Sequence, residues 1–102
     1  MITLRILQRY SVQDEADFLA LEKQFADLEI NRPDLPKGKR SKPISAAEPV
    51  NTLIWEADFP DLAAAQAALD LFAADPEHEI LFRQQCPFIE QVKIEFYQKL
   101  IF

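Results

Sequence analysis

Apolar and polar residues alternate in three stretches of the chain, which is the pattern of a β-strand with one buried face. The three stretches are residues 2–9, 51–59 and 90–98. Their predicted inward-facing sets are Ile2/Leu4/Ile6, Leu53/Trp55/Ala57 and Val92/Ile94/Phe96. A slip of one residue in the middle strand would exchange the faces of Trp55 and Ile54, so the pattern favours an inward Trp55 without deciding it.

Apolar residues recur every three or four positions in two longer stretches, which predicts helices that bury one face. The first helix begins at Ser11, whose hydroxyl is placed to cap it, and runs for about 18 residues. Its apolar stripe is Phe18, Leu21, Phe25 and Leu28. Acidic residues, among them Glu22 and Glu29, fall largely outside this stripe, so we expect them on a solvated face.

The second helical stretch covers residues 62–74 and is rich in alanine, which has the highest helix propensity. Its stripe is Leu62, Ala65, Leu69 and Phe72. Asp75 and Pro76 then combine a capping residue with a proline at the first helical position, which predicts a short third helix ending near Cys86.

Residues 31–50 interrupt these patterns with prolines and basic residues. Five basic residues and one acidic residue give residues 31–44 a charge of +4, which leaves −10 on the rest of the chain. Because a structureless loop of this length is unusual in a compact domain, we expect part of it, near residues 39–45, to form a short edge strand.

Composition narrows the class of protein. The 102 residues suit one domain spanning residues 1–102, and their net charge of −6 argues against sequence-independent binding to nucleic acid. No apolar run is long enough to span a membrane, and the start of the chain lacks the pattern of a signal peptide. A single cysteine, Cys86, and a single histidine, His78, exclude a cysteine-based zinc cluster and a two-histidine metal site within one subunit. We therefore expect a cytoplasmic protein without a metal or cofactor.

The predicted order of elements is β-α-(β)-β-α-α-β, which indicates an α+β, ferredoxin-like domain with its helices on one face of an antiparallel sheet. The other face is then mixed in character. Its residues would include Arg5, Glu56, Lys93 and Glu95 beside Leu7, Ile54 and Tyr97. This face is either solvated and held by ion pairs, or it is the interface of a homodimer. We expect the homodimer, partly from the apolar C-terminal residues 100–102.

Two segments resemble a known family. Thr52-Leu53-Ile54-Trp55-Glu56 and Ala74-Asp75-Pro76-Glu77-His78, with Phe82, resemble the C-terminal half of NIPSNAP-like domains. The whole layout resembles the dimeric α/β-barrel superfamily, which includes small antibiotic-biosynthesis-type monooxygenases. The resemblance implies ferredoxin-like subunits whose sheets pair face to face across a two-fold axis as a dimeric α/β barrel.

Aromatic and titratable residues offer several candidate sites. Trp55 and Tyr97 could line a pocket for a flat aromatic compound, or Trp55 could simply pack in the core. His78 is a candidate general base or haem ligand, although a solvated histidine near a helix start is the simpler interpretation. Glu56 and Glu95 could form an acid–base pair, but ion pairing with neighbouring basic residues is the simpler expectation.

The basic residues 37–42, which include Arg40, could bind an anionic ligand or an acidic partner, or they could dock on the acidic remainder of the chain. Cys86 is expected to be a buried structural thiol. No catalytic residue is assigned from the sequence. The candidate ligand-binding residues are Trp55, Tyr97, His78, Arg5, Arg40 and Glu56.

Three functions remain open from the sequence. The favoured description is a small-molecule-binding dimeric α/β-barrel protein with no evident catalytic signature. The first alternative is a cofactor-independent monooxygenase-type enzyme acting on a small aromatic compound. The second is an interaction module that uses the basic residues 37–42. The expected partners are a second copy of the chain and a small aromatic or anionic ligand, with no nucleic acid and no membrane.

Overall fold

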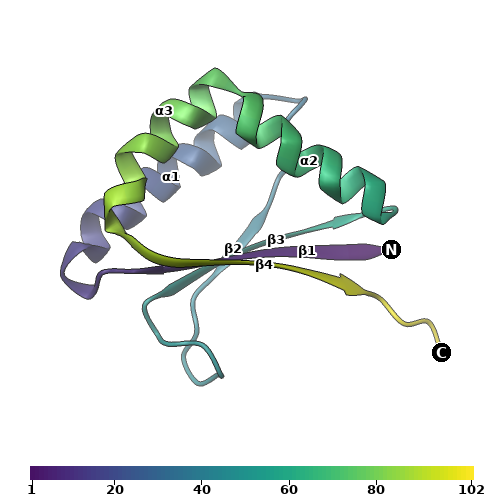
Figure 1. Cartoon of the computed structure of the whole chain (residues 1–102), viewed down its shortest axis with the longest axis horizontal. Helices are drawn as coiled ribbons and strands as arrows, with labels where there is room; N and C mark the ends of the chain where they lie inside the picture. The colour runs from purple at the N-terminus through teal and green to yellow at the C-terminus, as the bar shows by residue number, and fades with distance from the viewer.

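The computed structural model describes residues 1–102 as a four-stranded antiparallel sheet with three helices on one side (Figure 1). The strands are β1 (Ile2–Tyr10), β2 (Lys39–Ser41), β3 (Thr52–Phe59) and β4 (Ile89–Gln98). The helices are α1 (Glu15–Asn31), α2 (Leu62–Ala74) and α3 (Pro76–Gln85), with the 3-10 turns η1 (Val12–Asp14) and η2 (Cys86–Phe88). The strand order is β2-β3-β1-β4, so the predicted α+β, ferredoxin-like fold is confirmed.

The register of the sheet places Trp55 on the helix side. Ile6 of β1 lies opposite Trp55 of β3 and Ile94 of β4. Directly opposed residues of an antiparallel pair share a face, so these three side chains lie on the same side of the sheet. Ile54 pairs with Leu7 and faces the other way. The favoured register of the middle strand is therefore confirmed.

Local capping positions the helices, although not everywhere as expected. The side chain of Asp75 accepts a hydrogen bond from the backbone N–H of His78 at 2.9 Å, which confirms it as the cap of α3. Ser11 makes no such side-chain bond. The chain instead tightens into η1 there, because the N–H of Asp14 donates to the carbonyl of Ser11 at 3.0 Å, and α1 starts only at Glu15.

The helix layer is narrower than the sheet. Its apolar core joins α2 to β1 and β3 through Leu4, Trp55, Ala65 and Phe72. The helix-side residues of the edge strand β4 are poorly covered, and their exposed fractions are 45% for Val92, 51% for Ile94 and 36% for Phe96. A gap between the helices and β4 therefore remains along this edge.

The sheet face opposite the helices, here called the far face, is partly covered by the chain itself. Figure 1 shows the segment between β2 and β3 descending on this side, and Glu48 from that segment pairs with Lys93 of β4 at 3.0 Å. Leu7 and Ile54, which lie on the far face, are only 3% and 6% exposed. The sequence predicted either a solvated face or a homodimer interface here, and neither expectation included the long β2–β3 connection that returns beneath the sheet.

Two further expectations concern the burial of Cys86 and the presence of a membrane-spanning segment. Cys86 begins the turn η2 and is exposed, so the prediction of a buried thiol is wrong. None of the three helices combines the length and the apolar composition needed to cross a membrane.

Candidate functional site

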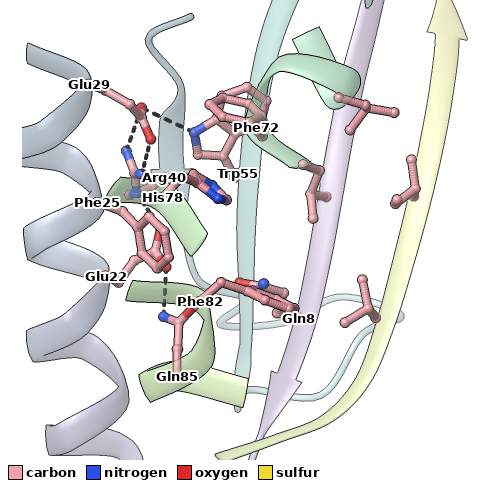
Figure 2. A pocket seen from close by; sticks show the side chains of 14 residues that line it. Gln8, Glu22, Phe25, Glu29, Arg40, Trp55, Phe72, His78, Phe82 and Gln85 are labelled. Atoms are coloured by element: carbon pink, nitrogen blue, oxygen red, sulfur yellow. Dashed lines mark hydrogen bonds and ion pairs between the residues drawn. The ribbon is translucent and has the colours of Figure 1, made fainter. Parts of the chain in front are cut away.

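A cavity of about 230 Å³ lies between the helix layer and the sheet, where the uncovered part of β4 meets α1 and α3 (Figure 2). Its apolar lining consists of Ile6, Phe25, Trp55, Leu69, Phe72, Phe82, Val92 and Ile94. Its polar lining consists of Gln8, Glu22, Glu29, Arg40, His78 and Gln85. Since a cavity of about 150 Å³ holds benzene, this one has room for one substituted ring or two fused rings.

Two carboxylates of α1 meet one guanidinium at the polar end of the cavity. Arg40 Nε donates to Glu22 Oε2 at 2.6 Å, while Arg40 Nη2 and Nη1 donate to the two oxygens of Glu29 at 2.6 and 3.2 Å. Burial alone would lower the pKa of Arg40, but the hydrogen bonds and charges of Glu29 and Glu22 raise it above its ordinary value. We call these three residues the Arg40 cluster.

The burial of both carboxylates contradicts the expected solvated acidic face, because Glu22 and Glu29 are only 6% and 4% exposed. They lie seven residues apart, so they share one face of the helix, and that face also carries the buried Phe18 and Phe25. The spacing of these four residues was therefore a usable signal in the sequence. What the sequence lacked was the partner, because Arg40 reaches α1 only through the pairing of β2 with β3.

The Arg40 cluster is tied to the rest of the cavity by further hydrogen bonds. Glu29 Oε1 also accepts from the indole nitrogen of Trp55 at 3.3 Å and from the backbone N–H of Gly38 at 3.0 Å. Glu22 Oε1 accepts from the amide nitrogen of Gln85 at 2.9 Å. Figure 2 shows these side chains converging from α1, β2, β3 and α3. The orientation of Trp55 is therefore fixed by a hydrogen bond as well as by packing.

Gly38, the only glycine, allows the chain to pass close to this indole ring. A Cβ atom at this position would lie 1.9 Å from the indole nitrogen of Trp55. A side chain here would displace the ring or the backbone that donates to Glu29. Glycine is required here because the backbone passes close to Trp55. Its backbone conformation does not require glycine, because its φ is not positive.

His78 enters the cavity from the first turn of α3. Its ring stacks on Phe72 with ring centres 4.8 Å apart and is tilted against Phe25, also at 4.8 Å. Burial lowers the pKa of His78 although Asp75, Glu29 and Glu79 oppose this shift, so the imidazole is neutral near pH 7. A solvated histidine, the simpler expectation, is therefore not what the structure contains.

The structure brings together three of the six candidate ligand-binding residues. Trp55, His78 and Arg40 line the cavity. Tyr97, Arg5 and Glu56 lie on the far face, because residue 97 pairs with residue 3 and residue 5 pairs with residue 56. The predicted shared pocket of Trp55 and Tyr97 is therefore wrong, since the two side chains point to opposite faces of the sheet.

The far-face candidates form a separate group of surface contacts. Arg5 Nη1 lies 3.9 Å from a carboxylate oxygen of Glu95, and the Arg5 guanidinium lies 5.7 Å from the ring centre of Tyr97. Glu95 is thus paired with a cation, as the simpler interpretation of the two glutamates expected. None of these residues lines the cavity between the helices and the sheet, so the group does not contribute to that site.

The basic residues 37–42 dock in part on the acidic helix of their own chain. Arg40 belongs to the Arg40 cluster, and Lys42 pairs with Glu15 of α1. The hydroxyl of Tyr10 donates to the same carboxylate of Glu15. Only Lys37 and Lys39 remain exposed without an ion pair, so little of the basic stretch is available to a separate partner.

Replacing Arg40 by methionine should destabilise the protein strongly. The Arg40→Met variant leaves two buried carboxylates without a counter-charge, and the free energy of unfolding should fall by about 3–5 kcal/mol. Urea denaturation followed by the fluorescence of Trp55 measures this change. The matched control is Lys42→Met, which breaks a solvent-exposed pair and should leave the free energy of unfolding nearly unchanged. Equal effects of the two substitutions would contradict the role given to the Arg40 cluster.

Comparisons with known proteins show where else this architecture occurs. The sequence matches no protein-family model and no curated protein. An uncharacterised NIPSNAP domain protein from Burkholderia xenovorans is 16% identical, with a TM-score of 0.82 over 100% of this chain and 97% of that one. A NIPSNAP family protein from Agrobacterium tumefaciens is 12% identical, with a TM-score of 0.79 over 99% and 87%.

A candidate antibiotic biosynthesis monooxygenase from Nitrosomonas europaea is 11% identical, with a TM-score of 0.70 over 99% of this chain and 100% of that one. At these identities the likeness concerns the fold. The resemblance predicted from the sequence is thereby confirmed at the level of architecture: the chain has the ferredoxin-like fold that NIPSNAP domains and antibiotic biosynthesis monooxygenase-like proteins share.

Proposed function

We propose that the chain binds a small, flat aromatic molecule in the cavity between its helices and its sheet. The observation that carries this proposal is the division of the cavity of about 230 Å³ into aromatic walls and one polar end. Such a site combines apolar surface, which supplies affinity, with a few polar groups, which orient the ligand. Its volume limits the ligand to about two fused rings.

The aromatic walls are held in place before any ligand arrives. Trp55 and Phe72 contact each other edge to face, with ring centres 5.6 Å apart and planes at 86°. The hydrogen bond of Trp55 to Glu29 and the stacking of Phe72 on His78 fix both rings further. A preorganised wall reduces the entropy lost on binding, so a small contact area can still give useful affinity.

The cavity should bind 1-naphthol, and filling its mouth should prevent this. Val92 lines the cavity and is 45% exposed. The Val92→Phe substitution therefore adds side-chain volume at the entrance with little effect on the packing of the core. We expect the dissociation constant, measured by isothermal titration calorimetry, to rise about tenfold or more. Ligand entry should also shift the single indole N–H resonance, which belongs to Trp55.

The matched control for this experiment is Val12→Phe, the same substitution at a position that is 67% exposed and outside the cavity. It should leave the dissociation constant unchanged. Equal affinities of the wild type and Val92→Phe would show that 1-naphthol binds elsewhere and would refute the proposed site.

The second candidate function is a cofactor-independent monooxygenase-type reaction on a small aromatic compound. The observation that favours it is that His78, neutral near pH 7 because of burial, lies in the same cavity as Trp55. A neutral imidazole can remove the proton of a bound phenol. The phenolate then supplies four electrons to O₂, so that one oxygen atom becomes a para carbonyl and the other leaves as water. The products from 1-naphthol are 1,4-naphthoquinone and H₂O, and no external reductant is needed.

This reaction predicts stoichiometric consumption of O₂ and formation of 1,4-naphthoquinone from 1-naphthol. The pKa of His78 lies below its ordinary value of 6.5, so the rate should hold at neutral pH and fall as the pH drops below about 6.5. The His78→Gln variant should lose the reaction while retaining binding, as followed with an oxygen electrode and by absorbance. A wild-type rate no higher than that of His78→Gln would exclude this candidate.

We further propose that the chain forms a homodimer through its far face. The exposed apolar groups that support it are Tyr97, which is 46% exposed, and the C-terminal Leu100, Ile101 and Phe102. An isolated subunit would present these groups to water. Leu7 and Ile54 add no support, because they are already buried in the single subunit, at 3% and 6% exposed.

Sedimentation equilibrium should give twice the 11.8 kDa mass of the chain at micromolar concentration. The Tyr97→Glu variant places a second carboxylate beside Glu95 on the far face, so it should weaken association. The control Gln98→Glu adds the same charge on the helix side of the same strand and should not. A monomeric wild type would overturn the dimer but would leave the ligand proposal standing.

A further inference from the structure

The polar end of the cavity carries an uncompensated negative charge. Glu22 and Glu29 contribute two carboxylates, and Arg40 contributes the one cation that pairs with them. His78 adds no positive charge, because burial keeps its imidazole neutral against the pull of nearby carboxylates. The lining of the cavity therefore holds a formal charge of −1, carried by two carboxylates that are only 6% and 4% exposed.

The number of hydrogen bonds that each carboxylate already accepts shows which of the two can accept one more from a ligand. Glu29 already accepts four hydrogen bonds, from Arg40, Trp55 and Gly38. A carboxylate offers about four acceptor positions, and the bonds of Glu29, three on Oε1 and one on Oε2, already equal that number. Glu22 accepts only two, from Arg40 and Gln85, and about half of its acceptor capacity is unused.

A second acceptor lies beside Glu22. The amide nitrogen of Gln85 donates to Glu22 at 2.9 Å and to the carbonyl of Phe18 at 3.4 Å. Both partners are acceptors, which fixes the orientation of the amide group, and the amide oxygen of Gln85 is left without a donor in the chain. Gln85 is 1% exposed and lines the cavity, and its amide oxygen accepts no hydrogen bond from the chain, although the one fully enclosed side-chain atom without a partner is Thr52 Oγ1.

The aromatic walls also favour a ligand that carries a positive charge. Phe25, Trp55, Phe72 and Phe82 surround the apolar part of the cavity, and the face of an aromatic ring attracts a cation electrostatically. Arg40 has two N–H groups left over after its three bonds, which an anionic ligand could in principle engage. An anion would nevertheless meet two carboxylates for each guanidinium, so the charge balance disfavours it.

We propose that the cavity is selective for a small aromatic amine in its protonated form, with the ring against the aromatic walls and the ammonium group at Glu22 and Gln85. This inference rests on the proposed binding function and specifies its ligand class. The ammonium supplies the donors that the two acceptors lack and cancels the residual charge of the Arg40 cluster. A neutral hydroxyl compound supplies a hydrogen-bond donor but cannot cancel the residual charge. A carboxylate supplies neither a donor nor a positive charge.

Three probes of similar size and different charge test this selectivity: 2-phenylethylamine, 2-phenylethanol and 3-phenylpropionate. Calorimetric titration near pH 7.5 keeps the amine protonated and His78 neutral. We expect the amine to bind the wild-type protein about tenfold more tightly than the alcohol, and the carboxylate to bind most weakly. Binding of the alcohol or the carboxylate as tight as that of the amine would overturn this inference alone. Failure of all three to bind would also refute the proposed binding function for single-ring ligands.

The Glu22→Gln variant identifies the residue responsible. It removes the excess negative charge while its amide oxygen can still accept from Arg40, so the preference for the amine over the alcohol should fall about tenfold. The control Glu90→Gln makes the same change in net charge at an exposed residue of β4 that pairs with Arg9, and it should keep the preference. An equal loss in both variants would mean that overall charge, and not the cavity, attracts the amine. If the Glu22→Gln variant does not fold, the relative affinities of the wild-type protein for the three probes still decide whether the cavity is selective for the amine.

Discussion

The pairing of two helix carboxylates with one strand guanidinium is the interaction on which the organisation of this protein depends. Arg40 brings the short edge strand β2 against α1, and Glu29 and Glu22 extend the connection to Trp55 of β3 and Gln85 of α3. Four elements that are distant in sequence thus meet at one polar centre. Because charges buried without partners are costly, each of these side chains has essentially one position that satisfies the others.

This polar centre also explains why the interior is hollow at this point. Apolar side chains pack against one another on either side of it, around Trp55 and Phe72 in one cluster and around Tyr10 and Phe18 in another. The cavity borders the first cluster at Trp55 and Phe72, and charged groups that are held by directed hydrogen bonds cannot move to fill it. A cavity with aromatic walls and a polar end is the result, and its geometry is maintained by the same bonds that satisfy the charges.

The width of the helix layer determines how the cavity is reached. The three helices cover β1 and β3 but leave the helix side of β4 half exposed, so the apolar residues Val92 and Ile94 border both the cavity and solvent. On the opposite face Leu7 and Ile54 are buried, and the β2–β3 connection runs beneath the sheet. The two faces of one sheet thus differ in structure, with the cavity on one and exposed ion pairs and Tyr97 on the other.

Local patterns in the sequence predicted the elements and the capping of α3 by Asp75 and favoured the inward face of each strand, because alternation, helical spacing and capping act between near neighbours. The sequence also singled out Trp55 and His78, each the only residue of its type, and Arg40 as one of the basic residues 37–42. Only the tertiary structure decided which candidates share a site. Strand pairing confirmed the expected position of Tyr97, Arg5 and Glu56 on the far face, and the burial of Glu22 and Glu29 required a guanidinium from a separate strand. Such contacts depend on how distant segments dock, and a one-dimensional pattern carries no information about the charge that will be placed opposite a buried carboxylate.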